Sequence, residues 1–113
     1  MNVVQAKLTR MDLHHPERSE IELPAVLQAF SDPHRLEIVH RLDADSEPRP
    51  CGTFGFDISK STMTHHFRTL REAGVIEQVR DGTTKLTSLR RDDLDARFPG
   101  LLDAVLSATK VPA

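Results

Sequence analysis

Residues Ser59 to Ile76 read SKSTMTHHFRTLREAGVI, and they contain the clearest helix signals in the sequence. Ser59 offers a side-chain oxygen that can cap the free amides at the start of a helix. Gly74 stands where helices commonly end in a left-handed residue, and good helix formers fill the second half of the stretch between them. We therefore expect a helix from Lys60 to Ala73.

The two sides of this helix differ in chemistry. With a rotation of about 100° per residue, Met63, Phe67 and Leu70 fall on one narrow apolar stripe. The opposite side has no acidic residue before Glu72, and its donors and acceptors suit base edges and phosphates in a DNA major groove. An ordinary solvated helix face is also polar, so this pattern needs support from its neighbours. The polar side consists of Ser61, His65 and Arg68, with Thr62, Thr64 and Thr69 on its flanks.

A β-hairpin is expected directly after this helix. Two β-prone runs at 75–80 and 84–89 are joined across Asp81-Gly82, which is a strong short hairpin signal. Arg80 and Lys85 would lie on this hairpin. A short helix, a turn, a second helix without acids on its outer face and an adjacent hairpin that bears Arg80 and Lys85 together describe a groove-reading helix beside a wing that contacts the DNA backbone.

Further helices are expected on both sides of this region. Asp32 followed by Pro33 is a helix-start signal, because the carboxylate caps free amides and the ring fixes the first φ angle. That helix would bury Leu36, Val39 and Leu42, with Ile38 beside them. Before the central helix we expect an arm that could contain a short helix around Val3 to Met11, a helix opened by Pro24 and ending at Phe30, a loop at 44–50 and a short turn at 51–58. After the hairpin we expect a turn capped by Asp92 or Asp93 and a helix opened by Pro99.

The predicted fold is therefore mainly α with a small β-hairpin wing, a winged helix-turn-helix in one 113-residue domain. We expect residues 1–23 to be a partly ordered or dimer-forming arm, 24–90 the DNA-binding core, and 91–113 a dimerisation helix. The net charge is −2, but residues 59–91 hold seven basic and three acidic side chains. This concentration of positive charge favours a phosphate-facing surface in the middle of the chain.

The segments Leu27 to Leu36 (LQAFSDPHRL) and Ser59 to Ile76 resemble the ArsR family of bacterial winged-helix repressors. The resemblance implies that the central helix reads operator DNA, that the hairpin touches the backbone, and that a ligand or metal releases the DNA. It further implies a homodimer formed by the arm and by Leu101, Leu102, Val105 and Leu106. The expected contacts with double-stranded DNA are Ser59, Lys60, Ser61, Thr62, Thr64, His65, Arg68, Arg71, Arg80 and Lys85.

We expect no metal and no cofactor. Metal-sensing members often carry Cys-x-Cys before the recognition helix, whereas this chain has Cys51-Gly52-Thr53, and one thiolate is too few for a stable site. Cys51 could be a thiol-reactive sensor or simply a small buried residue. His66 is expected to pack within the domain.

Other functions have weaker support. Glu37 and His40 match Glu-x-x-His, but a di-metal site needs a second copy, so we expect no enzyme. The lack of a secretory signal pattern and of long apolar runs predicts a cytoplasmic protein without a membrane span. Beside a DNA-binding repressor, two alternatives stay open: a winged-helix module that binds a protein, and a thiol or metal sensor in which Cys51 acts with His14, His15 and His34. The inducer is unknown.

Overall fold

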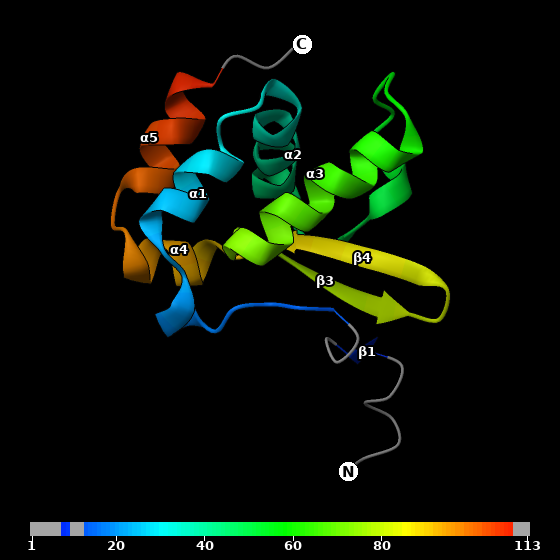
Figure 1. Ribbon diagram of the computed structural model, residues 1–113, viewed down its shortest axis with the longest axis horizontal. Helices are drawn as coiled ribbons and strands as arrows, with labels where there is room; N and C mark the ends of the chain where they lie inside the picture. Colours follow the sequence, from blue (N-terminus) through cyan, green and yellow to red (C-terminus); the bar gives the residue numbers. More distant parts are fainter. Residues whose placement is uncertain (1–7, 10–12, 110–113) are drawn as a thin grey trace.

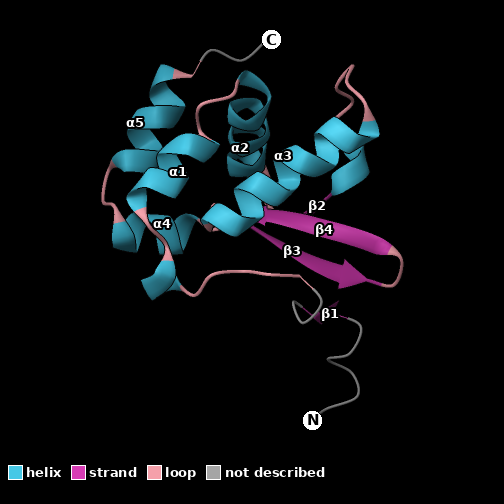
Figure 2. Cartoon of the chain, viewed as in Figure 1, coloured by secondary structure: helices cyan, strands magenta, loops and turns pink. Residues whose placement is uncertain are grey.

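The computed structural model describes residues 8–9 and 13–109, and within them the chain forms the predicted winged helix-turn-helix. Figures 1 and 2 show the helices gathered together, with a β-hairpin extending beneath the long central helix. The helices are α1 (Leu23–Ala29), α2 (Pro33–Ala44), α3 (Lys60–Ala73), α4 (Arg91–Arg97) and α5 (Leu101–Ala108), with single 3-10 turns at Arg18–Glu20 and Cys51–Thr53. The strands are β1 (Leu8–Thr9), β2 (Arg49–Pro50), β3 (Ile76–Asp81) and β4 (Thr84–Leu89).

The predicted helix starts are confirmed for α2 and α3. Asp32 Oδ1 accepts hydrogen bonds from the backbone amides of His34 and Arg35 at 2.8 and 3.1 Å, and Pro33 is the first helical residue. Ser59 Oγ accepts from the amide of Thr62 at 3.2 Å. These caps satisfy amides that have no partner inside the helix, and so they fix where each helix begins.

The sheet is antiparallel, with strand order β1-β3-β4-β2. The hairpin β3–β4 is confirmed, but its turn residues are Gly82 and Thr83, one position later than expected, because Asp81 pairs with Thr84 as the last rung of the ladder. The prediction of a loop at 44–50 was wrong at its end, where β2 pairs with β4. Within the range proposed for an arm helix, Leu8–Thr9 form a strand against β3, and the rest of that range lies outside the described residues.

Two predicted helix starts near the C-terminus were wrong. The residue before α4 is Arg90, and Asp92 and Asp93 lie inside its first turn. The Asp93 carboxylate instead accepts from Arg90 Nε at 2.9 Å, so it is engaged by a cation and not by free amides. Helix α5 begins at Leu101 after Gly100, whose φ of +84° is a left-handed conformation, and so Pro99 stands outside it.

One hydrophobic core joins residues from α1 to α5 and from the hairpin in the described part of the chain. Ile21 before α1, Ile38 in α2, Leu70 in α3, Ile76 in β3 and Leu102 in α5 are each at most 1% exposed. Ile38 is thus a central residue of the α2 stripe, while Leu36 is only partly buried against the core. The segments on both sides of the predicted DNA-binding core therefore contribute to the same core.

Candidate nucleic-acid interface

Helix α3 is anchored along the stripe predicted from its sequence. Phe67 and Leu70 are 7% and 0% exposed, and Met63 packs against the same core at its edge. Gly74 ends the helix with a φ of +88°, which lets the chain turn directly into β3. This anchoring fixes which side of α3 faces outward.

The polar side of α3 is exposed along its length. The Arg68 side chain is 67% exposed, and its Nε donates to Glu72 Oε2 at 3.0 Å. Exposed ion pairs of this kind contribute little, so this pair can be exchanged for a phosphate or a base at small cost. The exposed residues on and beside this side are Ser59, Lys60, Ser61, Thr62, Thr64, His65 and Arg68.

Hydroxyl groups cluster at the N-terminal end of α3. Ser59 Oγ lies 3.1 Å from Ser61 Oγ and 2.8 Å from Thr62 Oγ1, while Lys60 is exposed beside them. Hydroxyl donors, a positive helix end and an ammonium group all favour an anion at this end.

The wing carries its two cations on opposite strands. Arg80 of β3 and Lys85 of β4 are cross-strand partners. They lie next to the pair formed by Asp81 and Thr84, on the side away from the turn. Directly opposed residues in an antiparallel pair lie on the same face of the sheet. Both cations are half-buried, whereas residues 81–84 at the tip are exposed and include an acidic side chain. The positive charge of the wing therefore lies between its tip and the body of the domain.

Arg71 occupies a different environment from the rest of the predicted set. Its Nη1 donates to Gln78 Oε1 of β3 at 2.8 Å, and its Nε is buried without a hydrogen-bond partner among the described residues. Burial lowers the pKa of this guanidinium. Arg71 therefore lies between α3 and the sheet, and this position argues against the expected DNA contact.

Comparisons with known proteins agree with this geometry. Residues 30–79 match the family model described as a helix-turn-helix domain. An uncharacterized HTH-type transcriptional regulator of Bacillus subtilis (strain 168), YceK, is 38% identical over 82 residues, which cover 71% of this chain and 82% of the relative. The chain belongs to the HTH-type transcriptional regulators. The matched span 30–79 of this regulator contains α2, α3 and most of β3.

The residues predicted to form a dimer surface in the regulator have unequal exposure. Leu102 is 1% exposed within the single chain, so it is a core residue, whereas Leu101, Val105 and Leu106 are half-buried. Sequence reasoning missed Leu27 of α1, which is 47% exposed, whereas Leu23, which is 40% exposed, is the last residue of the predicted arm. Their spacing of four places them side by side on one helix face, and this was the signal that could have found them.

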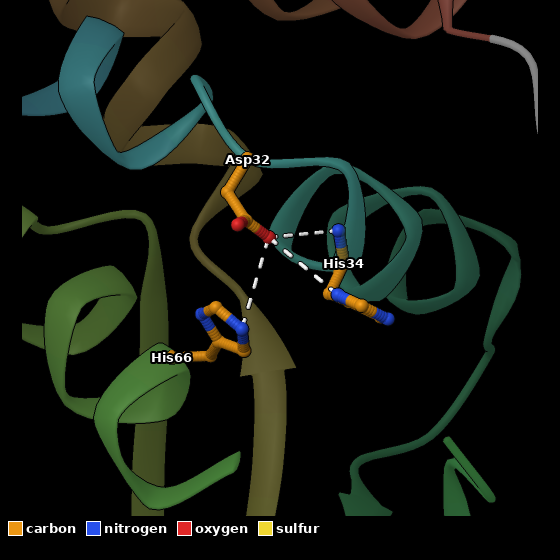
Figure 3. A group of neighbouring side chains, drawn as sticks. All are labelled: Asp32, His34 and His66. Carbon is orange, nitrogen blue, oxygen red and sulfur yellow. Dashed lines mark hydrogen bonds and ion pairs between the residues drawn. The ribbon is translucent and has the colours of Figure 1, made fainter. Parts of the chain in front are cut away.

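His66 packs within the regulator, as predicted. Its side chain is 7% exposed, and its Nδ1 accepts a hydrogen bond from Arg35 Nη1 at 3.1 Å. Figure 3 shows its other ring nitrogen, Nε2, facing the Asp32 carboxylate, and the Nε2 to Oδ1 distance is 3.8 Å. Burial lowers the pKa of His66 and outweighs the attraction of Asp32, so the ring is held neutral. His34 lies on the other side of the same carboxylate.

The remaining candidates are ordinary surface or edge groups. Cys51 is a half-buried free thiol in the 3-10 turn before α3. Glu37 pairs with Arg41 on the same helix. His14 is exposed, whereas His15 Nε2 accepts from the amide of Gln78 at 3.0 Å. None of the helices in the described part of the chain has the length and apolarity needed to cross a membrane.

Proposed function

We propose that this regulator is a dimeric repressor of the ArsR type that reads the major groove of double-stranded DNA with α3. The observation that carries the proposal is the exposed side of α3, where hydroxyls, His65 and Arg68 stand opposite the apolar stripe that packs against the core. Helices of this kind read base edges from the groove, while neighbouring elements hold the backbone.

We assign distinct roles to the three parts of this surface. Arg68 and His65 meet base edges, because their groups project from the middle of the exposed side. The hydroxyl cluster and Lys60 at the start of α3 hold a phosphate. Arg80 and Lys85 of the wing approach the backbone beside the groove, since the acidic tip beyond them is repelled by phosphate. Arg71 is left out of the interface.

DNA binding is tested with a labelled duplex from the region upstream of the regulator's own gene. Arg68→Ala should weaken binding by about 1–3 kcal/mol if the guanidinium contacts a base. The matched control is Arg18→Ala, because Arg18 is also an exposed arginine in an ion pair, 54% exposed and bonded to Asp93 of α4. Equal affinities for the two variants would refute the assignment of this side of α3.

Salt dependence separates the proposal from a protein-binding module. Two copies of a phosphate-contacting surface should give an affinity that falls steeply with salt concentration, because each neutralised phosphate releases counterions. Lys85→Ala should lower the slope of log affinity against log salt by about one per wing. A salt-insensitive interaction would favour the protein-binding alternative.

For the dimer, we propose that a second copy covers the exposed leucines of α1 together with the half-buried face of α5. Leu27→Glu should shift the sedimentation behaviour from dimer to monomer, since a charge would be buried at the interface. Ala25→Glu is the control, because Ala25 is exposed on the same helix but about 160° around it from Leu27. A dimer that tolerates Leu27→Glu as well as Ala25→Glu would contradict this interface.

A further inference from the structure

Three potential metal ligands meet where α2 begins beside α3. The ligand atoms of Asp32, His34 and His66 all lie within 4.8 Å of one another. Figure 3 shows the Asp32 carboxylate between the two imidazoles, 4.0 Å from His34 Nδ1 and 3.8 Å from His66 Nε2. Two of these residues are neighbours in sequence, and the third comes from a different helix.

We propose that Asp32, His34 and His66 bind one divalent transition-metal cation of the zinc class. Two imidazoles and one carboxylate are a donor set that such cations accept, with the fourth position left for water. This site is separate from the outer side of α3, and the proposal does not depend on DNA binding.

The geometry is close to what a metal requires. Ligand distances of about 2.0–2.2 Å in a tetrahedral site place neighbouring donor atoms about 3.3–3.5 Å apart. The two contacts of Asp32 therefore need to shorten by about half an ångström, and the two imidazole nitrogens, which lie within 4.8 Å of each other, need to approach by at most about 1.4 Å. His34 can provide the larger movement, because its side chain is 42% exposed, whereas His66 is held at 7% exposure.

Metal binding at this site requires the hydrogen bond from Arg35 to His66 to break. A guanidinium can only donate, so the bond from Arg35 Nη1 requires an unprotonated Nδ1 and places the His66 proton on Nε2. A metal on Nε2 requires the opposite tautomer, with the proton on Nδ1, and so the bond from Arg35 must break. Arg35 keeps its hydrogen bonds to the carbonyls of Ala29 and Gln28, which leaves it anchored to α1. Metal binding thus replaces the hydrogen bond between Arg35 of α2 and His66 of α3 by a metal ion that joins the same two helices.

The first test titrates Zn²⁺ into the full-length protein by calorimetry and uses Co²⁺ absorption to report tetrahedral coordination. We expect one ion per chain, and at least about tenfold weaker binding in His34→Ala. His65→Ala is the matched control, since His65 is the exposed histidine next to His66 and lies outside the cluster. Absence of one-to-one binding, or equal affinity in the two variants, would overturn the proposal.

The second test needs no variant and reads the tautomer directly. Nitrogen-15 NMR of the histidine rings should show His66 with its proton on Nε2 in the metal-free protein and on Nδ1 after Zn²⁺ is added. A His66 ring that keeps its Nε2 proton at saturating Zn²⁺ would place the metal elsewhere and refute the site.

Discussion

Gly74 joins the proposed recognition helix to the wing, and its replacement by alanine should be unusually costly. Its φ of +88° is in the left-handed region, where an L side chain is strained by about 1–2 kcal/mol. A Cβ added there would lie 2.6 Å from Ile21 Cγ1 and 2.9 Å from Ile21 Cδ1. Ile21 is 1% exposed and cannot move into solvent, so we add about 1–3 kcal/mol for overpacking.

Gly100 provides a control with the same backbone strain and no collision. Its φ is +84°, and a Cβ at this position would meet no atom within 4 Å. Gly100→Ala should therefore cost about 1–2 kcal/mol, and Gly74→Ala about 2–5 kcal/mol. The difference between the two variants isolates the contacts of the added Cβ, which are those with Ile21 and a further one with Pro16 Cγ at 3.2 Å.

Urea unfolding followed by circular dichroism measures both variants against the unmodified protein. Stability changes should appear as shifts of the midpoint at a common slope, because neither substitution alters the surface exposed on unfolding. Equal losses of stability in Gly74→Ala and Gly100→Ala would show that the segment containing Ile21 does not hold the end of α3 in the way described.

Two further predictions concern the start and the inner side of α3. Ser59→Ala should lower the free energy of unfolding by about 0.5–2 kcal/mol, because the amide of Thr62 loses its acceptor. Urea unfolding measures this loss, with Ser61→Ala as the control. Equal stability of the two variants would contradict the role of Ser59 as a helix cap. Because burial lowers the pKa of His66 below its ordinary value of 6.5, the unfolded chain binds this proton more tightly than the folded one. The stabilisation that comes from burying a neutral His66 should therefore be complete above about pH 6.5. It should be lost as the pH falls toward the pKa of His66 in the folded protein. Midpoints measured from pH 7.5 to 5 should show a smaller pH dependence in His66→Gln than in His65→Ala, and identical profiles would contradict it.

The elements that local sequence signals define were predicted well. Asp32, Ser59 and Gly74 act on amides or φ angles within three residues of themselves, and all three perform the predicted task. The failures occur where a distant partner decides the structure. Strand β2 exists because Arg49 and Pro50 meet β4, and Asp93 is bonded to the distant Arg18 as well as to the neighbouring Arg90. Neither β4 nor Arg18 can be inferred from a short window of sequence around its partner.

The candidate site also contains features that local sequence signals determine and features that distant partners determine. Helical periodicity places Phe67 and Leu70 inside and Arg68 outside, because the angle between them depends only on helix geometry. The same geometry places Arg71 only about 40° from Phe67, beside the buried stripe, but its hydrogen-bond partner Gln78 lies in the following strand and could not be predicted in this way. The cluster of Asp32, His34 and His66 also required the packing of α2 on α3, and sequence analysis had expected no metal.

Arg35 links the two surfaces on which the proposed function depends. It is 8% exposed, and its donors reach the last carbonyls of α1, Gln28 O and Ala29 O, as well as His66 of α3. A buried charge held by three partners is costly to displace, because any lost bond leaves it unsatisfied. Helix α1 carries Leu27, which we assign to the dimer, while α3 carries the side that we assign to DNA. In the dimer that we propose, Arg35 would therefore help to set the spacing of the two α3 helices, and a metal at His66 would replace its bond to α3.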